Sequence, residues 1–261
     1  VHEDIQGPKV LAHFVLHIQG DIELIDEFPR DYLSYTSRQH RWIRGDWQIG
    51  DWIWSRVPLA NGKRGPNPLS WYNRWKILDN MRRSLVAPTS LGLLVASWLA
   101  SPQMGYIAIL VVAIQLLFQP LAHPFTWATT RQGLKNFSLS KVAHDLLLAV
   151  VDAALLPHQA GLAVDAIVRV WYRRLISHRG LLEWASAQVM RWSTPHQLPT
   201  FLITMTLSSM FSGIVGLAVW QWMPANLAIA IPWLVLWFFS PLVGILLNLR
   251  PQTKPKQPLI A

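Results

Sequence analysis

The sequence predicts a mainly α-helical, multi-pass membrane bundle with interfacial helices. Of the 261 residues, 52% are hydrophobic and only 14% are charged, which is not the composition of a soluble domain. The 15 tryptophans agree, because indole rings favour the membrane interface. A helix needs roughly 20 apolar residues to cross about 30 Å of hydrocarbon. Four segments come close to or exceed this length: 85–101, 105–122, 200–222 and 226–248.

The charge pattern indicates the partner and the orientation. A net charge of +9 is compatible with nucleic acid, but Lys and Arg occur in blocks beside the apolar segments, as in cytoplasmic loops. We therefore expect a lipid bilayer as a partner and no nucleic acid. The connections 101–104 and 221–226 lack Lys and Arg, so the positive-inside rule predicts two hairpins with both chain ends in the cytoplasm. The chain has no cysteine, which excludes disulfides and thiolate metal sites.

Residues 1–20 show no firm period and begin with Val1. His13 and His17 stand at the i, i+4 spacing that can bind a metal, but no third ligand accompanies them, so we predict no metal site there.

Residues 21–26 alternate acidic and aliphatic side chains, which predicts a short strand with one buried face. The carboxylates could coordinate a divalent cation or act as a base, or they could form a solvated polar face. Asp26 is assigned to the solvated face, whereas Asp21, Glu23 and Glu27 stay possible acidic contributors to a site.

A basic and aromatic helix is predicted next, after Pro29 and with Asp31 or Ser34 as its cap. Within it Arg38, Arg41 and Trp42 have the spacing i, i+3, i+4, which places them on one face. Guanidinium groups suit phosphate, and an indole suits a sugar ring or a cation. The helix could hold a phosphorylated sugar donor and a sugar acceptor. Alternatively, it is an interfacial helix whose arginines meet lipid head groups.

The remaining segments complete the bundle. Residues 58–70 are rich in Pro, Gly and Asn and predict a loop, and residues 71–83 predict a second interfacial helix. Residues 139–176 predict two amphipathic helices broken at Pro157, cytoplasmic or re-entrant, with a further hairpin as the alternative. The expected organisation is 1–57 with the basic helix, 58–84 loop and interfacial helix, 85–122 hairpin, 123–199 cytoplasmic, interfacial or re-entrant helices, 200–248 hairpin and 249–261 linker.

Several strings resemble a known family. Arg38-x-x-Arg41-Trp42 resembles the (Q/R)xxRW signature of processive family-2-type glycosyltransferases. The longer strings DIELIDEFP, RQHRWIRGDWQ, RWKILDNMRRSLVAP, LLPHQAGLAVDAIVR and LLEWASAQ are similar to the cyclic β-1,2-glucan synthases and follow in the same order. The resemblance runs from about Asp21 to Arg250 and covers most of the chain.

This resemblance implies a hexosyltransferase of the bacterial inner membrane that moves glucose from UDP-glucose onto a growing β-1,2-glucan. Residues 1–57 would then be the C-terminal remnant of a cytoplasmic α/β GT-A-type domain. Arg38 and Arg41 match the signature positions near the donor diphosphate, and Trp42 matches the indole that stacks on the acceptor. Supporting residues of the same helix are Gln39, Arg44, Asp46 and Trp47.

The resemblance also implies parts outside the chain. A divalent cation, Mg or Mn, would be held by a DxD motif upstream, so no metal ligand is expected within this chain. Donor-binding and phosphorylase-like domains would be its partners. The family's His-Asp pair before the DIEL string is missing, because Ala12-His13 is followed by Phe14-Val15-Leu16, so the base is not assigned.

We therefore expect a fragment that is inactive on its own. One alternative is a non-catalytic membrane scaffold or pseudo-enzyme. A transporter with Asp145, Asp152 and Asp165 as a proton relay is a weaker alternative, since no inverted repeat is evident.

Overall fold

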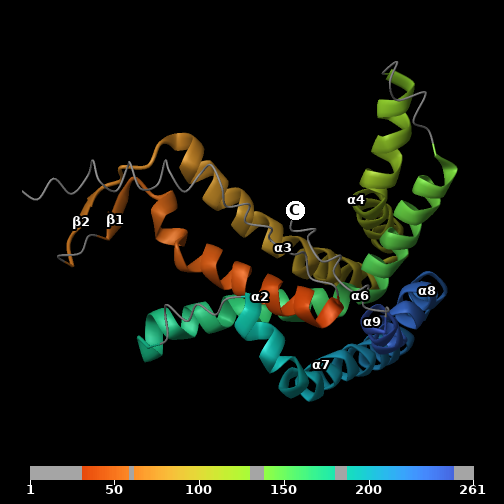
Figure 1. Ribbon diagram of the computed structural model, residues 1–261. Coiled ribbons are helices and arrows are strands. Elements are labelled where there is room, and N and C mark those ends of the chain that lie inside the picture. Colours follow the sequence, from red (N-terminus) through yellow and green to blue (C-terminus); the bar gives the residue numbers. More distant parts are fainter. Residues whose placement is uncertain (1–30, 59–61, 130–137, 180–186, 250–261) are drawn as a thin grey trace, which may run out of the picture.

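The computed structural model describes residues 31–58, 62–129, 138–179 and 187–249 (Figure 1). Within these ranges the chain is mainly helical, as predicted, and has one small sheet. The elements are α2 (Tyr32–Gln48), η1 (Gly50–Ile53), β1 (Arg56–Pro58), β2 (Arg64–Pro66), α3 (Trp71–Ala100), α4 (Pro102–Thr129), α6 (Leu139–Tyr172), η2 (Arg173–Ser177), α7 (Ala187–Trp222), η3 (Pro224–Asn226), α8 (Leu227–Phe238) and α9 (Ser240–Asn248).

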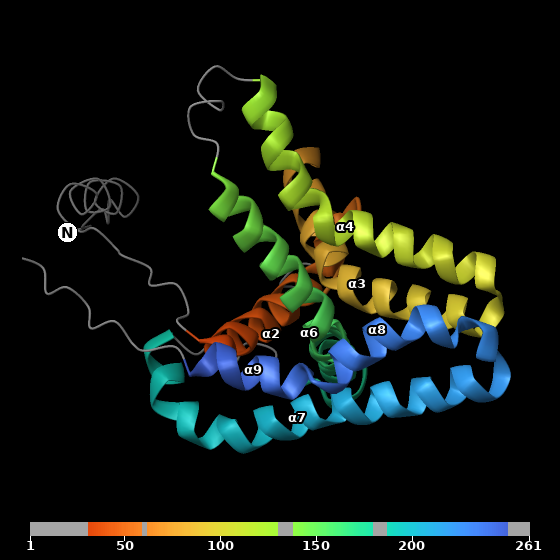
Figure 2. The same cartoon turned by 90° about the vertical axis from the view of Figure 1, so that its right-hand side faces the viewer.

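The described residues contain helices that are long and apolar enough to cross a bilayer. These are Trp71–Ala100, Leu139–Ser177, Phe201–Trp222 and Pro224–Asn248, with a shorter apolar helix at Pro102–Phe118. Figure 2 shows α3 beside α4 and α7 beside α8 as two antiparallel pairs, which α6 crosses. The predicted mainly α-helical membrane bundle is confirmed, and Ser101 alone separates α3 from α4. The set of candidate spans differs from the predicted one: Leu139–Ser177, expected as cytoplasmic, interfacial or re-entrant helices, is long and apolar enough to span, whereas the predicted span 105–122 corresponds to the shorter apolar helix.

A packed core joins the two helix pairs. Trp98 of α3 and Trp237 of α8 are both fully buried, and their ring centroids lie 5.4 Å apart. Asn226 donates from Nδ2 to the carbonyl oxygen of Trp98 over 2.7 Å. Gly105 allows close approach at this end, because a Cβ there would lie 2.8 Å from Cδ1 of Ile229. Such contacts stabilise helix pairs in lipid through van der Waals packing and interhelical hydrogen bonds.

The predicted break at Pro157 was wrong, because α6 is one continuous helix with Pro157 inside it. A proline removes the hydrogen bond to the carbonyl four residues earlier, which here belongs to Ala153. The indole Nε1 of Trp237 donates to this carbonyl oxygen over 3.1 Å. A side chain from α8 thus compensates for the missing backbone bond. Figure 1 shows α6 changing direction part-way along its length before it runs past α2.

Two further boundaries differ from the expected ones. The interfacial helix at 71–83 and the first span form the single helix α3, with Pro88 inside it. The last apolar segment is divided instead, because α8 ends at Phe238 and α9 begins at Ser240. At this division Ser209 of α7 donates from Oγ to the carbonyl oxygen of Phe238 over 2.6 Å.

The predicted loop at 58–70 contains the strand β2, which pairs with β1 just before it. β1 and β2 are antiparallel, and Val57, which is fully buried, lies opposite Gly65. Gly62 has a φ of +75°, a conformation that glycine adopts without a steric penalty. Strands of three residues that contain proline are too short to show an alternating pattern, so the composition indicated only a loop.

Candidate functional site

The helix with the basic and aromatic stretch begins where the sequence placed it. Asp31 is its N-cap, and Oδ1 of Asp31 accepts from the backbone N–H of Ser34 over 2.7 Å. The N–H of Leu33 is satisfied from outside the helix, by Oδ1 of Asn248 in α9 at 3.0 Å. Two donors of the first turn, which have no partner inside a helix, are therefore fixed by side chains.

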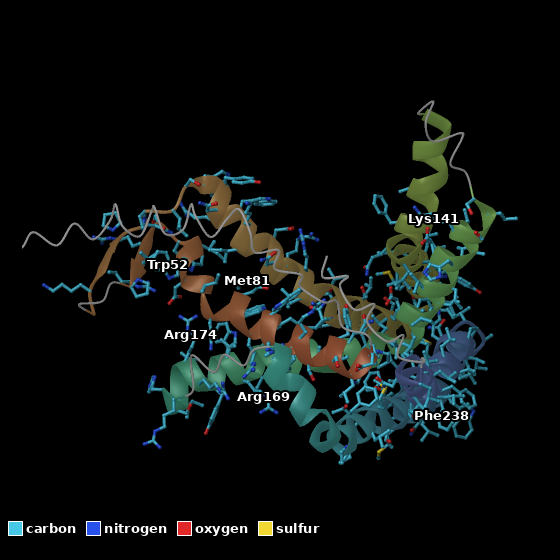
Figure 3. The ribbon with its side chains drawn as sticks, viewed as in Figure 1. Trp52, Met81, Lys141, Arg169, Arg174 and Phe238 are labelled. Atoms are coloured by element: carbon cyan, nitrogen blue, oxygen red, sulfur yellow. The ribbon has the colours of Figure 1, made fainter. Side chains whose placement is uncertain are left out.

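α2 lies beside the second part of α6, and the two helices run in the same direction. The contacts occur in the same order along both helices: Tyr32 with His158, His40 with Asp165, and Trp47 with Trp171. Beyond the end of α2, Asp51 of η1 forms an ion pair with Arg174. Figure 3 labels Arg169 and Arg174 on the ribbon that lies along α2. The spacing of about seven residues on each helix resembles a heptad seam, so α6 sets the register of α2.

The first contact of this seam is buried and polar. The hydroxyl oxygen of Tyr32 lies 2.9 Å from Nδ1 of His158, and Nε2 of His158 lies 3.3 Å from Oγ1 of Thr204. Thr204 already donates to the carbonyl oxygen of Phe201, so its oxygen accepts the proton on His158 Nε2. His158 Nδ1 is then the acceptor for the Tyr32 hydroxyl. Burial raises the pKa of Tyr32 well above its usual range.

The second contact is polar and partly exposed. Nε2 of His40 lies 2.8 Å from Oδ2 of Asp165, which also accepts from Nε of Arg169 over 2.6 Å. Burial lowers the pKa of His40, although its hydrogen bond to Asp165 acts in the opposite direction. The imidazole is therefore neutral at pH 7, and Nε2–H donates to the carboxylate.

The signature residues Arg38, which is half-buried, and Trp42, which is exposed, lie together on one side of α2. The guanidinium carbon of Arg38 is 4.7 Å from the centroid of the Trp42 ring, and 54% of Trp42 is exposed. Arg41 and Arg44 are half-buried and take part in other interactions. The structure thus presents the guanidinium of Arg38 and the indole of Trp42 as a pair.

The supporting residues have separate contacts. Gln39 donates from Nε2 to the hydroxyl oxygen of Tyr35 over 3.0 Å. Asp46 accepts from Asn80 of α3 over 3.2 Å, and Trp47 donates from Nε1 to Oγ of Ser84 over 2.8 Å. Burial raises the pKa of Asp46. Asp46 and Trp47 therefore fasten the C-terminal end of α2 to α3.

Several predicted residues lie outside the described part of the chain. These are the candidate acidic residues Asp21, Glu23 and Glu27, together with Asp26 and the pair His13 and His17. Among the described residues no three His, Asp or Glu side chains group in a way that could hold a metal ion. The side chains of the described residues therefore do not fit a divalent-cation site.

The chain is similar in sequence to the cyclic β-(1,2)-glucan synthase NdvB of Rhizobium meliloti (strain 1021). The two are 31% identical over 265 residues, which cover 96% of this chain. The chain is a homologue of that synthase. The relationship predicted from the motif strings is therefore confirmed. The aligned part spans 9% of the length of the relative. No family model matches the chain.

The motif strings did not predict the contacts that hold α2 in place. His40 stands inside the signature stretch, but its partner Asp165 is 125 residues away. Tyr35, which bonds Gln39 and stacks on Tyr32 with centroids 6.1 Å apart, had no signal beyond its aromatic character.

Proposed function

We propose that the chain is part of a membrane glycosyltransferase that polymerises glucose from UDP-glucose into cyclic β-1,2-glucan. The chain contributes the acceptor- and diphosphate-side helix α2 and the membrane bundle. The observation that carries this proposal is the contact between the half-buried Arg38 and the exposed Trp42 on a helix that packs against α6. The similarity to a cyclic β-(1,2)-glucan synthase supports it.

The proposed reaction is the transfer of a glucosyl group with inversion. An acceptor hydroxyl attacks the anomeric carbon, its proton goes to a base, and the bond to the UDP oxygen breaks. Negative charge develops on the departing diphosphate, where Arg38 and Arg41 stabilise it through charge-assisted hydrogen bonds. The exposed indole of Trp42 offers a flat apolar surface on which the acceptor sugar stacks.

The base and the cation belong to other residues. Asp21, Glu23 and Glu27 are the candidate acidic contributors before α2. A divalent cation, Mg or Mn, would neutralise diphosphate charge when bound. Its ligands would lie outside the described residues, since these hold no suitable cluster.

The orientation follows from the charges. The turns at Ser101 and at Met223 carry no Lys or Arg, whereas α2 carries Arg38, Arg41 and Arg44 at the other end of the bundle. The positive-inside rule then places α2 on the cytoplasmic side of a bacterial inner membrane, where nucleotide sugars are available.

The test is incorporation of labelled glucose from UDP-glucose in membranes that contain the whole native protein. Arg41→Ala abolishes incorporation and Trp42→Ala reduces it by about 10-fold or more, because each removes a group that acts on the diphosphate or the acceptor. Arg56→Ala and Trp71→Ala are matched controls, because both residues are exposed and lie outside α2. Activity that survives Arg41→Ala would contradict the role of this residue.

A complete lack of incorporation by the native protein would favour the non-catalytic scaffold instead. The isolated chain is expected to transfer no glucose, because the donor-binding residues and cation ligands are proposed to lie outside it.

A further inference from the structure

The exposed face of α2 extends beyond the signature residues. Tyr35, Arg38, Gln39 and Trp42 recur at i, i+3, i+4 and i+7, so they follow one another along a single helix face. Tyr35 is 37% exposed and Trp42 is 54% exposed. With a rise of 1.5 Å per residue, the two aromatic residues lie roughly 10 Å apart along the helix axis. This separation exceeds the length of a single sugar ring, so one sugar cannot occupy both positions.

The Tyr35 side chain is exposed and yet held in place. Its ring stacks on that of Tyr32, with centroids 6.1 Å apart and an interplanar angle of 22°. Its hydroxyl oxygen accepts from Nε2 of Gln39 over 3.0 Å. Tyr32 is in turn fixed by its hydrogen bond to the buried His158. Because these contacts restrict the ring before any ligand arrives, binding costs less side-chain entropy.

The chemistry of this patch matches a carbohydrate. Tyr35 offers an aromatic ring with a hydroxyl group, and Gln39 adds an amide that can both donate and accept hydrogen bonds. A sugar presents C–H groups to an aromatic face and hydroxyls at its rim, so this combination recognises it. No acidic side chain lies on this face between Tyr35 and Trp42.

We propose that Tyr35 and Gln39 form a second glucan subsite on α2, two helical turns before Trp42. This inference rests on the proposed function and extends it: Trp42 takes the sugar at the growing end, and Tyr35 with Gln39 holds a sugar further along the same glucan. The subsite makes binding depend on the length of the glucan.

The test compares two probes, a β-1,2-linked glucose disaccharide and a longer linear β-1,2-linked oligosaccharide, on the full chain in detergent or nanodiscs. Binding is followed by saturation-transfer NMR and calorimetry. In the wild-type chain the longer probe binds more tightly. Tyr35→Ala weakens binding of the longer probe about two- to tenfold, the range of one aromatic contact, and leaves the disaccharide unaffected. Trp42→Ala weakens both.

Two variants separate the contributions of ring and amide. Tyr35→Phe keeps the ring and retains most of the length dependence, whereas Gln39→Ala loses part of it. Tyr72→Ala is the matched control, because Tyr72 is an exposed tyrosine on another helix, α3.

Each outcome decides between the proposals. Equal weakening of both probes by Tyr35→Ala, or no weakening of either, overturns the subsite while the role of Trp42 stands. If the wild-type chain binds neither probe, both the subsite and the acceptor role in the proposed function fail. An unchanged thermal unfolding curve for Tyr35→Ala excludes misfolding as the cause of a loss.

Discussion

Tyr32 connects the exposed face of α2 to the interior of the bundle. Its hydroxyl bonds His158, its ring packs edge-on against Phe201 with centroids 5.9 Å apart, and its other neighbour is the exposed Tyr35. A single side chain therefore contacts α6, α7 and the outer face of its own helix. Its position decides how rigidly the first turns of α2 are held.

Tyr32→Phe is expected to lower the unfolding free energy by about 1–2 kcal/mol. The substitution keeps the ring and removes the hydroxyl, which leaves a buried acceptor on His158 without its partner. Tyr35→Phe is the matched control and should cost less, because its hydroxyl bond is exposed. Denaturant unfolding in detergent measures both variants. An equal loss of unfolding free energy in the two variants would contradict the conclusion that the buried hydrogen bond of Tyr32 contributes more than the exposed one of Tyr35.

His40 is expected to titrate below its ordinary pKa of 6.5, because it is partly buried. Between its folded-state pKa and 6.5 the unfolded chain then binds more protons than the folded chain, so stability falls as the pH is lowered through this window. NMR titration of labelled histidines gives the pKa, with His40→Gln as the assignment control. The same variant should also remove part of the loss of stability below pH 6.5. Titration of His40 above 6.5 would disprove the effect.

At the scale of elements, α9 packs closely against α7 at Gly244. A Cβ at this position would lie 2.8 Å from Sδ of Met205 and 3.3 Å from Cζ of Phe201, and both residues are buried. α9 also supplies Asn248, which completes the first turn of α2. The packing at Gly244 therefore positions α9 both against α7 and for its hydrogen bond to α2.

Gly244→Val is expected to cost about 1–3 kcal/mol, as overpacking of a filled core does. Gly213→Val is the control, since a Cβ at Gly213 meets nothing within 4 Å. Thermal unfolding in detergent compares the two variants. If both shift the midpoint equally, then the helix propensity of valine and not the packing is the cause.

Some elements could be predicted from the sequence because their signals are local. The cap Asp31 and the start of α2 follow from residue type and spacing, and the hairpins follow from apolar length. The continuity of α6 could not be predicted, because Trp237, which satisfies the carbonyl freed by Pro157, is 84 residues from Ala153. In the site, the spacing placed Arg38 and Trp42 on one helix face with Arg41, and the structure brings Arg38 into contact with Trp42. The partners of Tyr32 and His40 are 126 and 125 residues away and leave no local pattern.

At the scale of the whole molecule, the two helix pairs place their turns at one end of the bundle and α2 at the other (Figure 2). Since the chain contains no cysteine, a single introduced thiol reports its own location without background. Met104 beside the first turn and Trp54 after α2 are 54% and 65% exposed, so either position accepts a reagent.

Met104→Cys is expected to react with a membrane-impermeant maleimide added to intact spheroplasts, whereas Trp54→Cys reacts only after permeabilisation. The reason is the positive-inside rule, which places the arginines of α2 in the cytoplasm. Gel-shift labelling of the two variants measures this. Reaction of Trp54→Cys in intact spheroplasts would contradict this orientation, because α2 would then lie outside the cytoplasm, where nucleotide sugars are not available.

The hydrogen bond from Leu33 to Asn248 joins residues 215 positions apart, and this distance has a consequence for biosynthesis. The ribosome completes α2 long before it makes α9, so the N–H of Leu33 has no access to Asn248 until the helices between them have been synthesised. Contacts between such distant residues form late. The first turn of α2 therefore gains this hydrogen bond only after α9 is in place. A chain that ends before Asn248 would leave the N–H of Leu33 without this acceptor.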